Sequence, residues 1–70
     1  MSTPRQYAAA LAGHMPAEAL DGGAKDRLVR TLVRRGWSDV HIAEHTRWST
    51  YTVTRIRERL GLAANHGEVG

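Results

Sequence analysis

The sequence predicts an all-α fold, and three observations lead to that prediction. Apolar residues recur three and four positions apart in consecutive segments between residues 24 and 62. Residues that start or stop helices flank each segment, and nowhere does the chain show the pattern of a strand. The 70 residues include no cysteine. Without disulfides, a chain of this size closes a core most readily by packing three helices.

Residues 1–23 are expected to form an N-terminal extension that is partly helical or flexible and only weakly packed. Pro4 suits the first turn of a helix that would continue through residues 5–12. Gly13 then interrupts the pattern. The Asp21-Gly22-Gly23 sequence is expected to break the chain again before the main domain.

The first helix of the main domain is predicted over residues 24–35. Its apolar stripe consists of Leu28, Val29, Leu32, Val33 and Trp37. Asp26 stands four positions before Arg30, in the favourable order for an ion pair along a helix. Gly36 is well placed to end the helix in the left-handed conformation.

Two shorter helices are predicted over residues 39–46 and 50–60. Ser38 and Ser49 are their expected N-caps, because a serine hydroxyl accepts from the unpaired N–H groups of a first helical turn. Between these helices, Trp48 is expected to anchor the turn in the core.

The last helix should end at Gly61, with Leu62 folding back onto its final turn. Three apolar residues of this helix are expected in the core, namely Val53, Ile56 and Leu60. Residues 63–70 carry no pattern and are predicted to be a disordered tail.

Positive charge is concentrated in the predicted main domain. Residues 24–62 hold nine basic and four acidic side chains, a net charge of +5, whereas residues 1–23 and 63–70 each carry −1. Eight of the nine cations are arginines, whose forked guanidinium matches phosphate oxygens and guanine edges. This distribution favours a nucleic-acid partner over a merely solvated basic face.

The stretch from Ile42 to Ile56 resembles the helix-turn-helix of bacterial and phage regulators. Small Ala43 lies where the two helices cross, and Ser49 gives the second helix an abrupt start. Four residues are similar to the core of the lac repressor family, namely Ser49, Thr52, Val53 and Arg55. The same framework occurs in homeodomain-like domains. With residues 57–62 included, the chain most resembles small helix-turn-helix proteins of actinobacterial phages and mobile elements.

One position departs from that resemblance. Arg47 stands at the first position of the turn, where glycine is usual. It fits there only if the turn avoids the left-handed conformation or accepts a modest energetic cost.

The resemblance implies a role for each exposed residue of the turn and the last helix. The residues expected to contact bases in the major groove are Thr50, Tyr51, Thr54 and Arg55. The residues expected to contact phosphates are Ser49, Thr52, Arg47, Arg57 and Arg59. For Tyr51 the alternative is packing against the preceding helix, and for Glu58 we favour a local pair with Arg55.

The segment His41-Ile42-Ala43-Glu44-His45 also matches a metallopeptidase string, but no third ligand or cleft accompanies it. Both histidines are therefore expected to face solvent. Without a cysteine nucleophile, a phosphate loop or paired carboxylates, we expect no enzyme, no metal and no cofactor.

We therefore expect a cytoplasmic, sequence-specific double-stranded DNA-binding protein that regulates transcription and inserts residues 50–60 into the major groove. Arginines of the first and third helices of the main domain would hold phosphates. A module this small seldom binds tightly alone, so we predict dimerisation, a second module or a partner protein. The expected surface for this contact consists of Tyr7, Leu11, Met15 and Leu20. The alternative is a protein-interaction module that uses the same scaffold to bind RNA polymerase or a recombinase. Neither function involves a membrane or a small-molecule substrate.

Overall fold

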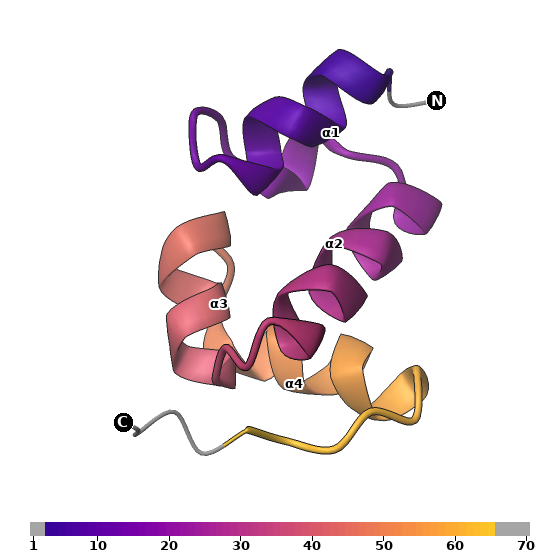
Figure 1. Cartoon of the computed structure of the whole chain (residues 1–70), viewed down its shortest axis with the longest axis vertical. Coiled ribbons are helices and arrows are strands. Elements are labelled where there is room, and N and C mark those ends of the chain that lie inside the picture. The colour runs from indigo at the N-terminus through magenta and orange to yellow at the C-terminus, as the bar shows by residue number, and fades with distance from the viewer. Residues whose placement is uncertain (1–2, 66–70) are drawn as a thin grey trace.

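Four α-helices and one short 3-10 helix make up the computed structural model, which describes residues 3–65. In chain order they are α1 (Pro4–Leu11), η1 (Ala17–Ala19), α2 (Gly22–Arg34), α3 (Asp39–Thr46) and α4 (Thr50–Arg59) (Figure 1). The described residues contain no strand, so the all-α prediction is confirmed. None of these helices has the length and apolar character needed to cross a membrane.

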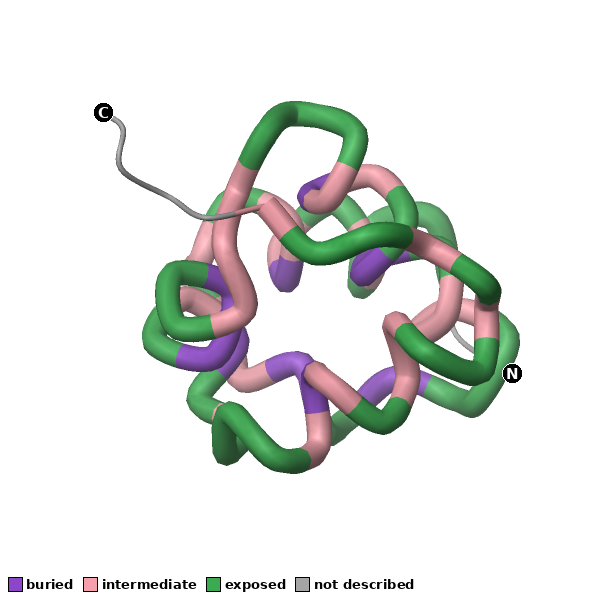
Figure 2. The backbone as a smooth tube through the Cα atoms, turned by 90° about the horizontal axis from the view of Figure 1, so that it is seen from below, coloured by how far each residue is buried: buried purple, intermediate pink, exposed green. Residues whose placement is uncertain are grey.

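Every helix contributes to one core. Its fully buried large side chains come from α2, α3 and α4 and include Leu28, Leu32, Ile42 and Val53. Buried positions lie on the inner sides of the helices and exposed positions on their outer sides (Figure 2). The core is thus enclosed by all the helices rather than by the three of the predicted main domain.

The N-terminal segment is part of this core, so the expectation that it packs weakly is wrong. Ala10 and Ala17 are fully buried and Leu20 is 4% exposed. Alanine gives only a weak apolar signal in a sequence. Its small side chain nevertheless lets two backbones approach closely, and this closeness allows α1 and η1 to reach the core.

The chain breaks before α2 at Leu20 and Asp21, which are extended, but the predicted start of the helix at residue 24 is wrong, because α2 begins at Gly22. The carboxylate of Asp21 accepts a hydrogen bond from the Ala24 N–H at 2.9 Å and caps the helix. Such a cap contributes about 1 kcal/mol, which offsets much of the helix cost of a glycine in the first turn. At its other end α2 stops before Gly36 (φ +89°), as predicted.

The apolar face of α4 is less buried than predicted. Val53 is fully buried, but Ile56 and Leu60 are only half-buried and are not in the main core cluster. The helix ends as expected, since the Leu62 N–H donates to the Arg57 carbonyl across Gly61. α4 is therefore anchored by one buried side chain and by its contacts with both neighbouring helices.

The chain after α4 turns back toward the junction between α2 and α3. The side-chain amide of Asn65 donates to the carbonyls of Val33 (2.8 Å) and Trp37 (3.0 Å). The Val33 carbonyl also accepts from the Gly36 N–H, so Asn65 adds a second bond there and ties the chain after α4 to the loop between α2 and α3. The predicted disorder of residues 63–70 is therefore wrong at Asn65, while residues 66–70 lie outside the described residues.

Candidate functional site

A sharp turn connects α3 to α4, and a buried threonine holds it. Thr46 is fully buried. Its hydroxyl donates to the Ile42 carbonyl at 2.7 Å and accepts from the Trp48 N–H at 3.3 Å. Trp48 itself is half-buried and packs against the core, as predicted. The turn is thus fixed from inside by one polar residue and one aromatic residue.

Arg47 adopts the left-handed conformation in this turn, with φ 67° and ψ 21°. Among the described residues it is the only non-glycine with a positive φ. The sequence left open a turn that avoids the left-handed conformation and a turn that accepts its energetic cost. The structure has the second, and the left-handed backbone of Arg47 costs about 1–2 kcal/mol. The Arg47 side chain is exposed, directly before the start of α4.

Ser49 starts α4 as predicted. Its hydroxyl accepts from the Thr52 N–H at 3.1 Å and donates to the Thr52 hydroxyl at 3.0 Å. Two residues expected to contact phosphates are thus bonded to each other. Their first role is to define the beginning of the helix, which leaves Thr50 exposed at its tip.

The outer face of α4 presents an arginine and a tyrosine that contact each other. Nη1 of Arg55 donates to the Tyr51 hydroxyl at 2.7 Å. The guanidinium carbon lies 5.5 Å from the centre of the Tyr51 ring, within cation–π range. Tyr51 is 68% exposed, so it does not pack against α3. Within residues 3–65, no hydrogen bond or ion pair joins Glu58 to Arg55, so the expected local pair is absent.

Asp39, at the start of α3, ties together two other residues predicted to contact DNA. Its carboxylate accepts from the Thr54 hydroxyl at 2.8 Å and from Nε of Arg57 at 2.9 and 3.1 Å. Arg57 also donates to the Leu62 carbonyl at 2.8 Å, and its side chain is only 11% exposed. Thr54 and Arg57 therefore bind α4 to α3 and do not share the exposed face.

Arg59 is held by a carboxylate as well, but at the surface. It bonds both carboxylate oxygens of Asp26 on α2, so the predicted Asp26–Arg30 pair is replaced by a contact between helices. The hydrogen bonds that Arg59 donates to Asp26, and the negative charge of that carboxylate, raise the pKa of the Arg59 guanidinium. The Arg59 side chain remains 60% exposed, yet its charge is largely compensated.

The predicted site residues thus fall into two groups. Exposed and available at the start and outer face of α4 are Arg47, Thr50, Tyr51 and Arg55. Engaged in contacts that shape or hold the helix are Ser49, Thr52, Thr54, Arg57 and Arg59. Sequence reasoning missed Asp39, because its place in a first helical turn is already explained by the helix dipole.

A second group of cations lies on the outer side of α2. Arg27, Arg30 and Arg34 are exposed and stand three and four positions apart, which places them on one stripe of the helix. Arg27 lies over the ring of Tyr7, 5.5 Å from its centre. Among the described residues, none of the three has an ion pair with a carboxylate. We call these three residues the α2 stripe.

The two histidines of α3 differ from their predicted environment. His41 is exposed but stacks on Trp37, with ring centres 3.9 Å apart. His45 is half-buried and packs edge-on against the same tryptophan, and its Nε2 donates to the Leu11 carbonyl at 2.7 Å. The expectation that His45 faces solvent is therefore wrong. Within the described part of the chain, no cluster of three or more His, Asp or Glu side chains could hold a metal.

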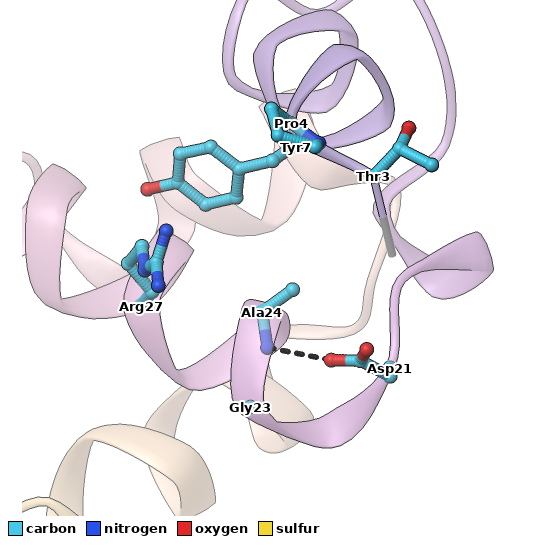
Figure 3. Close-up of a pocket in the computed structure, with 7 residues that line it drawn as sticks. All are labelled: Thr3, Pro4, Tyr7, Asp21, Gly23, Ala24 and Arg27. Carbon is cyan, nitrogen blue, oxygen red and sulfur yellow. Dashed lines mark hydrogen bonds between the residues drawn. The ribbon is translucent and has the colours of Figure 1, made fainter. Parts of the chain in front are cut away.

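A cavity of about 520 Å³ opens between the beginnings of α1 and α2. Its lining consists of Thr3, Pro4, Tyr7, Asp21, Gly23, Ala24 and Arg27 (Figure 3). Tyr7 and Arg27 form one wall, and Asp21 caps α2 on the other side. α1 lies at the opposite end of the molecule from α4, so this cavity is remote from the exposed face of α4 (Figure 1).

No protein-family model, no curated protein and no solved structure matches this chain. The assignment of a function therefore depends on the residues and geometry described above.

Proposed function

We propose that this chain is a sequence-specific double-stranded DNA-binding protein that acts as a transcriptional regulator. In this proposal α3, the turn at residues 47–49 and α4 form a helix-turn-helix, and α4 is the recognition helix. The observation that carries the proposal is the outer face of α4. There the serine-capped start of a helix presents Thr50, Tyr51 and Arg55 outward, away from the core.

The dimensions of α4 suit the major groove. Its ten residues give a length of about 15 Å. A major groove about 12 Å wide admits one α-helix and exposes the edges of all four bases. Arg55 lies one turn after the tip of α4 and can direct its fork at the N7 and O6 acceptors of guanine. Thr50 and Tyr51 would approach neighbouring bases.

Charge supports contacts with phosphates on either side of the groove. Arg47 is exposed next to the start of α4, and Ser49 and Thr52 carry hydroxyls at the same end. Arg57 and Arg59 are weaker candidates than their position suggested, because Asp39 and Asp26 already bind them. Arg30 and Arg34 of the α2 stripe add exposed guanidinium groups that no carboxylate binds in the described structure, whereas Arg27 lines the cavity remote from α4.

A partner copy or partner protein belongs to the proposal, since one small module buries only about 600–1,000 Å² on DNA. The side chains expected to form that contact are only partly exposed or buried. Leu20 is buried, and Tyr7, Leu11 and Met15 pack partly buried against the core.

The alternative function is a protein-interaction module that binds RNA polymerase or a recombinase. The observation that favours it is the α2 stripe, since exposed arginines that no carboxylate binds in the described structure also suit an acidic protein surface. Only the first function requires selective DNA binding that depends on Arg55.

Substitution of Arg55 tests the proposal, with Arg30→Ala on the α2 stripe as the matched control. We expect Arg55→Ala to cost about 1–3 kcal/mol of binding at a single base pair. Arg30→Ala should weaken binding to all sequences alike, since phosphate contacts carry no base information. Fluorescence anisotropy on a duplex selected by the wild-type protein gives both values. Selective DNA binding that survives Arg55→Ala would contradict the assignment of α4.

A further inference from the structure

We propose that Tyr51 positions Arg55 so that its guanidinium reads a guanine, and that the selected DNA site therefore contains this guanine beside another base with a major-groove acceptor. This inference rests on the proposed DNA-binding function and makes it more specific. Tyr51 is assigned the role of a positioning residue as well as a surface contact.

The contact between Tyr51 and Arg55 leaves two guanidinium nitrogens of the arginine free to bind a base. Only Nη1 of Arg55 is engaged, by the Tyr51 hydroxyl at 2.7 Å. Within residues 3–65, no hydrogen bond or ion pair reaches Nε or Nη2. Those two nitrogens form one side of the planar fork, the geometry that donates two parallel bonds to N7 and O6 of guanine.

The tyrosine ring restrains the arginine from a second direction. The guanidinium carbon lies 5.5 Å from the ring centre, and the residues are four positions apart on the same face of α4. An unrestrained arginine loses much rotamer freedom when it binds a base. Because Tyr51 already holds Arg55, part of this loss is incurred in the folded protein before DNA arrives. Preorganisation of this kind raises affinity without adding a contact.

The hydroxyl of Tyr51 adds a donor next to the fork. It accepts a hydrogen bond from Arg55, so its own proton remains available to an acceptor on DNA. The pair therefore presents only donors to the groove. In the major groove guanine offers two acceptors, and thymine and adenine each offer one. A guanine next to either of these bases matches the pair, whereas cytosine presents a donor at the corresponding edge.

The competing explanation is a contact that stabilises the helix surface and nothing else. Both explanations predict the hydrogen bond, but they differ in the coupling between the two residues on DNA. Tyr51→Phe is the discriminating variant, because it removes the hydroxyl and keeps the ring. Circular dichroism and thermal unfolding establish that each variant is folded.

The experiment is a double-mutant cycle on a duplex selected by the wild-type protein from a pool with a randomised central segment. We compare Tyr51→Phe, Arg55→Ala and the double variant on this duplex and on one in which the guanine is replaced by adenine. Wild-type protein should prefer guanine about 5- to 150-fold. Tyr51→Phe should weaken binding to the guanine duplex about three- to tenfold and reduce that preference.

The double variant should lose less affinity than the product of the two single losses, because part of the effect of Tyr51 acts through Arg55. If the two losses multiply, or if Tyr51→Phe keeps the full preference for guanine, the positioning role is overturned while DNA binding by α4 stands. If the wild-type protein selects no duplex from the pool, the proposed function itself fails. A selected site without guanine, or without a requirement for Arg55, also overturns the inference.

Discussion

Arg47 adopts a backbone conformation that three other turns of the chain assign to glycine. Gly13, Gly36 and Gly61 all have positive φ, and Arg47 joins them at 67°. An arginine costs more there than a glycine, because its Cβ crowds the neighbouring carbonyl. A functional demand for a cation beside the start of α4 would explain why the side chain is tolerated.

Replacement of Arg47 by glycine tests both halves of that explanation. We expect Arg47→Gly to raise the free energy of unfolding by about 0.5–1 kcal/mol. The substitution relieves the strain in the folded protein, but glycine also makes the unfolded chain more flexible, which offsets part of the gain. In a domain of this size about 1 kcal/mol raises Tm by roughly 4–8 °C. The same variant should bind DNA more weakly, with a salt slope smaller by about one.

Arg47→Ala is the matched control, because it removes the charge and keeps the strain. It should lose the same DNA affinity without becoming more stable. An Arg47→Gly protein that is less stable than wild type, or that binds DNA unchanged, would contradict this account of the turn.

Single residues also limit what a sequence can predict about a site. Arg55, Thr54 and Arg57 all appear on α4 as polar residues suited to DNA. Only the position of Asp39 separates them, because its carboxylate bonds Thr54 and Arg57 and leaves Arg55 outside. That contact joins residues 15 and 18 positions apart, and no local pattern predicts it.

At the scale of elements, α1 is joined to α3 through one close contact. Nε2 of His45 donates to the last carbonyl of α1, at Leu11. A Cβ at Gly13 would lie 2.9 Å from Cε1 of His45. Since Trp37 packs on the same ring, His45 has little room to move aside. The lack of a side chain at residue 13 is therefore what lets the two helices meet.

Comparison of two glycine substitutions tests this junction. Gly13→Ala and Gly36→Ala both place a Cβ at positive φ, at a cost of about 1–2 kcal/mol each. Only Gly13→Ala also meets His45, since nothing lies within 4 Å of a Cβ at Gly36. The clash with His45 should lower the free energy of unfolding of the Gly13→Ala variant by about a further 1–3 kcal/mol. Urea unfolding measures both variants.

The extra loss of unfolding free energy caused by Gly13→Ala should be smaller when His45 is also changed to alanine, because that change removes the imidazole ring that the new Cβ would meet. If Gly13→Ala and Gly36→Ala lower the free energy of unfolding equally, α1 does not contact α3 in this way.

The elements that sequence reasoning predicted well are those set by local hydrogen bonds. Ser38, Ser49 and Gly61 each act within three residues of the helix end that they define, so their spacing along the chain suffices. The start of α2 was wrong, because two glycines outweighed the Asp21 cap in the prediction. The docking of α1 and the hydrogen bonds of Asn65 were missed, since both depend on residues about thirty positions away.

At the scale of the whole molecule, the N-terminal segment is part of the folded unit. Ala10, Ala17 and Leu20 belong to the same core cluster as the large side chains of α2, α3 and α4. Small domains have only a few kcal/mol of net stability, so losing one part of the core affects the whole. Residues 24–62 are therefore not expected to fold independently.

Removal of residues 1–20 tests the unity of the core. We expect the remaining chain to lose most of its helical circular dichroism at 25 °C and to unfold without a cooperative transition. The single substitution Leu20→Ala should cost about 2–5 kcal/mol, since it removes a buried leucine. A shortened chain that keeps the helicity and cooperative melting of residues 21–70 would show that the N-terminal segment is dispensable.

DNA binding through α4 is tested by a proton–nitrogen NMR titration of the whole chain with random-sequence duplex DNA at two salt concentrations. We expect amide shifts centred on residues 47–59, largest at the start and outer face of α4. These shifts should weaken steeply with added salt, because phosphate contacts release counterions. Shifts confined to α2, with α4 unaffected, would contradict the recognition-helix assignment. No shifts at low salt would contradict DNA binding altogether.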